Sequence, residues 1–258
     1  MLMSTLTIAL AAGSTVVALA FAGSTYERWL ARRNRHELAW SIALLLFALG
    51  AVSLWAGATI GWGEVTFRFF YAFGAILNVP ALALGTIYLL AGSRIGDRFA
   101  VGIGLLLAFA GGVIAVAPLN SSYEFDPAVL PQGSEVFGLL PRIIAAVYSG
   151  AGALVVFGGA IWSIASIRRK QPRLVVGNLV IALGTAVLSM SGLLNSLFGE
   201  MDAFAITLTA GIVVLFAGFL ISTSSNAPLS SSHLSSSQPS IIQELNKPRG
   251  PSKLSSTG

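Results

Sequence analysis

Charge and cysteine are what this sequence has least of. Asp, Glu, Lys and Arg make up only 10% of its 258 residues, whereas soluble domains carry about 25%. Together with a hydrophobic share of 55%, so little charge is typical of a chain that resides in a membrane. The complete lack of cysteine excludes disulfides, thiolate metal sites and cysteine nucleophiles.

Histidine and buried carboxylates are scarce as well. The two histidines, His36 and His233, lie in a basic loop and in the C-terminal tail, so they do not form a metal site together. No Asp or Glu lies deep within an apolar run, which disfavours proton-coupled carriers and pumps. No phosphate-binding glycine loop and no Ser/His/Asp set occurs in these runs. We therefore expect no catalytic residues, no metal site and no cofactor, and a protein that is not an enzyme.

Long apolar runs are what the sequence has in abundance. A helix needs about 20 apolar residues to cross a bilayer, and seven runs are of that order. The sequence therefore predicts an all-α integral membrane bundle of seven transmembrane helices in residues 1–222, with the lipid bilayer as its surroundings. The predicted spans are 4–23, 38–57, 67–91, 99–118, 139–163, 174–198 and 203–222.

Basic residues fall in alternate connections between these runs. One set of connections, together with the tail, holds all but two of the 15 basic residues, and the other set holds only Arg68 and Arg142 with most of the acids. Cytoplasmic loops are enriched in Lys and Arg, so we predict the N-terminus outside and the C-terminus in the cytosol. Short basic clusters between apolar runs also argue against a nucleic-acid partner.

Two features at the ends of the chain allow alternative interpretations. Residues 1–22 end in "AFA", which resembles a signal-peptidase site, but no basic residue precedes Arg28 and cleavage would place the arginine-rich loop 24–37 outside. We therefore expect the first run to remain as a span. The Ser-rich tail, residues 223–258, is predicted to be disordered in the cytosol, although its "SIIQEL" segment offers a helical turn to a cytosolic partner.

Two stretches carry a family resemblance. The stretches "ERWLARRNRHELAWSIALLLFALGAVSLWAG" and "RFFYAFGAILNVPALALGTIYLLAG" resemble a group of uncharacterised multi-span membrane proteins of actinobacteria and related bacteria. The resemblance covers roughly residues 26–92 and implies a bacterial inner (plasma) membrane, but no activity and no site residues. The predicted topology also resembles that of rhodopsins, yet the last span has no lysine to bind retinal.

The third predicted span contains costly polar residues. At 100° per residue, Arg68, Tyr71 and Asn78 share one helix face. Pro80 has no N–H to donate to the carbonyl of Ile76, so we expect a kink near the middle of the bilayer. Because an amide facing lipid would be badly solvated, this face should point into the bundle or into a wet cavity.

Other spans supply partners for this face. We predict an outward-facing pocket, with guanidinium groups at its mouth and Asn78 at its floor, for a small polar or anionic ligand from outside. The alternative is packing alone, in which Ser, Thr and Asn bond across helices for about 0.6 kcal/mol each. The arginines then extend to the membrane surface or pair, Arg68 with Glu64 and Arg142 with Glu135 or another acid of the outer loop. The candidate pocket residues are Arg68, Tyr71, Asn78, Arg142, Ser149, Asn178 and Ser189.

The sequence leaves two functions open. The first is a sensory or scaffolding protein whose bundle is read through its cytosolic loops and tail. The second is a permeation protein for a small solute, with its site at the break between Asn78 and Pro80, because transporters bind substrate at broken helices near the midplane. The longest connection between spans, residues 119–138, is either a lid over the pocket or a spacer.

Overall fold

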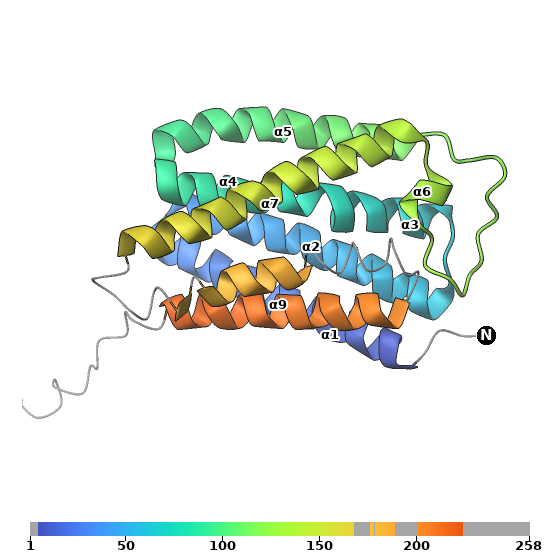
Figure 1. Cartoon of the computed structure of the whole chain (residues 1–258), viewed down its shortest axis with the longest axis horizontal. Coiled ribbons are helices and arrows are strands. Elements are labelled where there is room, and N and C mark those ends of the chain that lie inside the picture. Colours follow the sequence, from blue (N-terminus) through green and yellow to red (C-terminus); the bar gives the residue numbers. More distant parts are fainter. Residues whose placement is uncertain (1–4, 168–175, 178, 189–200, 224–258) are drawn as a thin grey trace, which may run out of the picture. The chain divides into compact units, whose positions relative to one another are not determined.

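The computed structural model describes residues 5–167, 176–177, 179–188 and 201–223. The described residues form helices and no strand, apart from one isolated antiparallel bridge between Leu119 and Phe137. Most of the predicted span 174–198 and the predicted tail 223–258 lie outside these residues. Figure 1 shows long helices lying side by side, with short connections after α1, α2 and α4 and a long one between α5 and α7.

Six helices are long and apolar enough to cross a membrane, which supports a multi-pass membrane protein. They correspond to the predicted spans one to five and seven, and the described part of the sixth is the helix Leu179–Leu188. The helices are α1 (Thr5–Arg32), α2 (Arg35–Ile60), α3 (Glu64–Phe70), η1 (Tyr71–Leu77), α4 (Asn78–Ala91), α5 (Ser93–Val116), α6 (Gly133–Val136), α7 (Leu139–Ile167) and α9 (Met201–Thr223). The segments α3, η1 and α4 follow one another without a gap and form the third span.

The structure corrects the predicted link between the first two spans. Residues 24–37 are not a loop, because α1 continues to Arg32 and α2 begins at Arg35. The segment has neither proline nor glycine, and its four Arg and two Glu residues are good helix formers. Between the two helices only Arg33, with φ 55°, and Asn34, which is extended with φ −75° and ψ 124°, leave the helical conformation. The change in polarity therefore marks the expected membrane boundary and not the end of the helix.

The short links leave neighbouring helices antiparallel. Links at residues 33–34 and 92 lie at one end of the bundle, here called the link end (Figure 1). Residues 61–63 and 117–138 lie at the opposite end, here called the loop end (Figure 1). Helix α1 packs along α2 and α9, and the third span packs against α2, α5 and α7.

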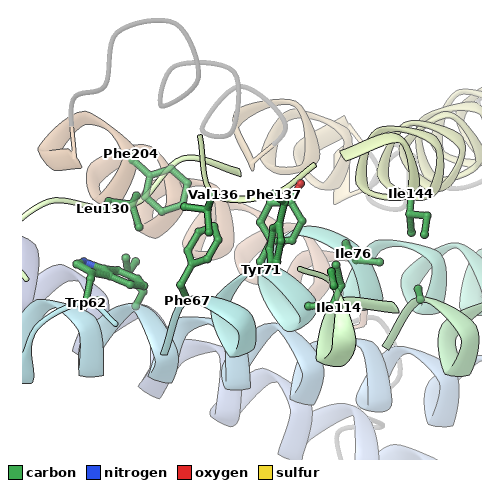
Figure 2. Close-up of a cluster of buried hydrophobic side chains, with 14 residues drawn as sticks. Trp62, Phe67, Tyr71, Ile76, Ile114, Leu130, Val136, Phe137, Ile144 and Phe204 are labelled. Carbon is green, nitrogen blue, oxygen red and sulfur yellow. The ribbon is translucent and has the colours of Figure 1, made fainter. Parts of the chain in front are cut away.

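Aromatic and aliphatic side chains fill the loop end. Figure 2 shows Phe67 and Tyr71 of the third span against Phe137, with ring centroids 5.4 Å and 5.1 Å from it. Phe137 belongs to the connection 117–138, which also buries Val136 and Leu130. The backbone N–H of Trp62 donates to the carbonyl of Pro127 at 3.1 Å. This connection is thus a packed cover of the bundle and not a loose spacer.

Candidate functional site

The stretch "RFFYAFGAILNVP" contains a change of helix type. Tyr71–Leu77 form a π-helix between α3 and α4. Pro80 lacks the N–H that the Ile76 carbonyl would accept, and its ring would meet that carbonyl in a regular helix. The wider π turn ends three residues before Pro80, whereas the kink expected at Pro80 stays a prediction. The π turn lies on the N-terminal side of the proline, and such π segments are frequent at functional sites.

Small residues of neighbouring helices contact this π-helix closely. A Cβ on Gly50 of α2 would lie 2.8 Å from the Cα of Gly74, so the two backbones touch. On α7, the Ser149 hydroxyl donates to the carbonyl of Ala75. This hydrogen bond satisfies a backbone carbonyl of the π-helix and holds α7 beside it.

A cavity of about 650 Å³ lies beside the π-helix. Drug-sized ligands occupy pockets of about 300–1,000 Å³. Its described lining comes from α2, the third span, residues 131–134, α7, the Leu179–Leu188 helix and α9. Four of the seven predicted pocket residues line it: Tyr71, Asn78, Arg142 and Ser149.

Polar groups line the loop-end half of this cavity. Tyr71 and Arg142 are joined there by Gln132 and Ser134 of the connection before α7. Gly133 lies directly on the Tyr71 ring, where an added Cβ would be 2.4 Å from Cε2. Toward the link end the lining is mostly apolar and includes Leu44, Phe47, Leu82, Val156 and Leu215. The cavity therefore has polar groups at its loop end, beside apolar ones such as Phe67, Phe70 and Phe204, and mostly apolar side chains toward its link end.

Asn78 lies between the two ends. The side chain is buried, with 7% of the residue exposed, which confirms that it faces the bundle interior. Its Oδ1 has no hydrogen-bond partner among the residues that the structure describes. A buried acceptor left without a donor costs about 1–3 kcal/mol. The Oδ1 of Asn78 is therefore an acceptor in the cavity wall for which a ligand or a water molecule would supply the missing donor.

Arg68 has a different position from the one expected. It does not line the cavity. Its guanidinium donates to the carbonyls of Ile114 at 2.6 Å and Ala117 at 2.8 Å. Its Nε donates to Glu64 at 2.9 Å, which confirms the predicted i,i+4 pair. Arg68 thus caps the C-terminal end of α5, where a cation also complements the helix dipole.

The remaining predicted residues divide into two groups. Arg142 is exposed, and no described residue forms an ion pair with it, so the predicted pair with Glu135 is absent. Asn178 and Ser189 lie outside the described residues. Within the described ranges, no group of three or more His, Asp or Glu side chains is placed to hold a metal ion.

Sequence reasoning missed a buried ion pair at the link end. The Nη2 of Arg28 lies 2.9 Å from the Oε1 of Glu37, and the Glu37 side chain is 1% exposed. The Arg28 guanidinium also lies 4.8 Å from the centroid of the Phe219 ring on α9. The pair and Phe219 join α1, α2 and α9, and none of the three residues lines the cavity. In the sequence, the signal for this pair is Glu37, the acid of the basic segment 24–37 that lies across the turn from Arg28.

Comparison with known proteins adds no family to this description. No protein-family model matches the chain, and neither a curated protein nor a solved structure shows significant similarity to it. Inferences about function therefore start from the geometry of the cavity.

Proposed function

We propose that the chain is a sensory protein that binds a small ligand in the cavity beside the π-helix. In this proposal the loop end faces the outside, the link end faces the cytosol, and the membrane is the plasma membrane of a bacterial cell. The proposal rests on one observation, the buried side chain of Asn78, which lines a cavity of about 650 Å³ and whose Oδ1 has no protein donor among the described residues. The role is binding and not catalysis.

The distribution of polarity favours sensing over permeation. A polar solute would meet Tyr71, Gln132 and Arg142 at the loop end, but mostly apolar side chains beyond Asn78. A permeation path needs polar or wet lining on both sides of its central site. Occupancy would be passed to the cytosolic side by the helices that line the cavity and continue to the link end. A cytosolic partner on the loops or tail would read that change.

Permeation remains the second candidate because of the helix break. The π segment Tyr71–Leu77 ends directly at Asn78, and transporters place their substrate sites at interrupted helices near the midplane. In that case the apolar half of the cavity would open during transport.

Thiol labelling distinguishes these functions, because the natural chain has no cysteine. Single cysteines would replace Tyr71, Asn78 and Leu82, and each variant would be treated with a membrane-impermeant maleimide on intact cells and on inverted vesicles. Ser122→Cys in the exposed connection is the positive control, and Leu105→Cys on the exposed apolar face of α5 is the negative control.

A sensing pocket predicts that Tyr71→Cys and Asn78→Cys react on one side only, while Leu82→Cys does not react. Reaction of Asn78→Cys and Leu82→Cys from both sides would contradict the sensing function and support permeation. Failure of both Tyr71→Cys and Asn78→Cys to react, with Ser122→Cys fully labelled, would exclude a solvated pocket and leave a scaffolding role.

A further inference from the structure

The polarity and length of the cavity point to a class of ligand. We propose that the cavity binds a long-chain amphiphile with a carboxylate head and a hydroxyl group part-way along its chain. The carboxylate contacts Arg142, the hydroxyl donates to Asn78, and the rest of the chain lies among the apolar side chains toward the link end. This inference rests on the proposed ligand-binding function and names its ligand.

The first argument is the length of the lining. On α7 the lining extends from Arg142 to Val156, and on the third span it extends from Phe67 to Leu82. At a rise of 1.5 Å per residue, both stretches are roughly 20 Å long. A compact solute would fill only part of such a cavity, whereas an extended chain contacts all of it.

The second argument is the chemistry of the head-group end. Arg142 has no ion-pair partner among the described residues, so its charge is available to a ligand. Arg142 is also the only cation among the described lining residues, and neutral groups of Tyr71, Gln132 and Ser134 surround it. One guanidinium beside neutral donors matches a monoanion, and its planar fork matches a carboxylate.

The third argument is the acceptor on Asn78. A plain hydrocarbon chain would leave the buried Oδ1 without a partner, at a cost of about 1–3 kcal/mol. A hydroxyl on the chain supplies the missing donor. Because Ser149 contacts Ala75, the two helices are in register there, which puts Asn78 roughly 15 Å beyond Arg142 along the bundle. The hydroxyl of 12-hydroxystearate lies at about that distance from its carboxylate.

The fourth argument is the apolar end. Leu44, Phe47 and Leu215 of α2 and α9 face Leu82 and Val156 of the third span and α7 across the cavity. Each buried CH₂ contributes about 0.8 kcal/mol, so the carbons beyond the hydroxyl supply much of the affinity. A polar solute gains nothing from this half.

The test uses the full chain in lipid nanodiscs, with empty nanodiscs as the background for partition into lipid. Displacement of radiolabelled 12-hydroxystearate would be measured with unlabelled 12-hydroxystearate, stearate, methyl 12-hydroxystearate and 3-hydroxybutyrate. The natural chain should bind 12-hydroxystearate about ten-fold more tightly than stearate, since only the former satisfies Asn78.

Three variants assign the contacts, and a fourth is the control. Asn78→Leu should remove the preference for the hydroxylated acid, with Asn78→Ala as a second variant that leaves more space. Arg142→Gln should weaken both acids by about ten-fold and leave the methyl ester unchanged. Arg94→Gln removes an exposed arginine outside the cavity and should bind like the natural chain.

Four outcomes would overturn the inference. Equal binding of stearate and 12-hydroxystearate by the natural chain, or a preference that survives in both Asn78 variants, removes the hydroxyl contact. Saturable binding of 3-hydroxybutyrate without binding of either long acid means the ligand class is wrong while the binding function stands. If no acid binds and Asn78→Cys is also closed to maleimide, the binding function itself fails.

Discussion

Two ion pairs near the link end differ in their burial. Arg28 and Glu37 have side chains 26% and 1% exposed, whereas Arg35 and Asp97 have side chains 54% and 44% exposed. We predict that Arg28→Met lowers the free energy of unfolding by about 3–5 kcal/mol, because it leaves a buried carboxylate without its cation. Chemical denaturation of the purified chain measures the loss.

The exposed pair is the matched control for this prediction. Arg35→Met should cause no measurable loss, because an exposed ion pair is screened by water. The double variant Arg28→Met, Glu37→Leu should recover most of the stability, since it removes both buried charges together. A double variant as unstable as Arg28→Met alone would show that the contact with Phe219, and not the ion pair, carries the effect.

Arg68 gives a second prediction at the scale of one residue. Arg68→Met keeps the aliphatic stem but removes the bonds to the carbonyls of Ile114 and Ala117. We expect a loss of about 2–4 kcal/mol in unfolding free energy, because hydrogen bonds to charged groups are the stronger ones. Arg94→Met, on an exposed arginine, should leave stability unchanged. Unaltered stability with lost ligand binding would instead place Arg68 in the site.

Individual residues were predictable where their partner was close in sequence. The pair of Arg68 with Glu64 follows from i,i+4 spacing, and the inward position of Asn78 follows from the cost of an amide in lipid. The carbonyl partners of Arg68 were not predictable, because they depend on where α5 ends and how it packs on the third span. Arg142 does not pair with Glu135, because Glu135 belongs to α6 within the folded connection 117–138.

At the scale of helices, the contact between α2 and η1 limits side-chain size. We predict that Gly50→Ala destabilises the chain by about 1–3 kcal/mol, because its Cβ would lie 2.8 Å from the Cα of Gly74 and neither backbone has room to move without loss of packing. Thermal or chemical unfolding of the purified variant checks the direction and the size.

Gly23→Ala on α1 is the control for this contact. Nothing lies within 4 Å of a Cβ at that position, so the higher helix propensity of alanine should raise stability or leave it unchanged. Opposite signs for Gly50→Ala and Gly23→Ala would establish the backbone contact. The same small effect for both variants would contradict it.

Helix existence was predictable and helix type was not. Apolar runs predict all six long helices, because length and hydropathy alone identify a bilayer-crossing segment. The π-helix depends on how Pro80 and the residues before it pack against Gly50 and Ser149. No local sequence pattern specifies that packing. The continuation of α1 to Arg32 was not predictable from polarity, because a polar segment outside the apolar run is able to remain helical.

At the scale of the whole molecule, alternate connections should lie on opposite sides of the membrane. We predict that Ser122→Cys reacts with an impermeant maleimide on intact cells, while Asn34→Cys reacts only on inverted vesicles. Both positions are exposed and belong to opposite ends of the bundle. The physical reason is the concentration of arginines at the link end. The reverse pattern would overturn the predicted orientation and place the polar end of the cavity in the cytosol.

The cavity was predictable in place but not in size. A shared polar face on the third span and a partner face on α7 predict that Tyr71, Asn78, Arg142 and Ser149 meet, and the structure brings them together. The volume depends on the small residues of α7 and on the cover formed by residues 117–138. Both follow from packing between segments that are distant in the chain.

The two-residue link between α1 and α2 bears on how the chain is synthesised. Because only Arg33 and Asn34 separate the helices, neither helix has enough slack to enter the bilayer by itself and wait for the other. The pair is complete once residues up to Ile60 have left the ribosome, so it is able to insert as one preformed hairpin. Its orientation would then be decided once for both helices, and each later helix would insert beside a pair that is already in place.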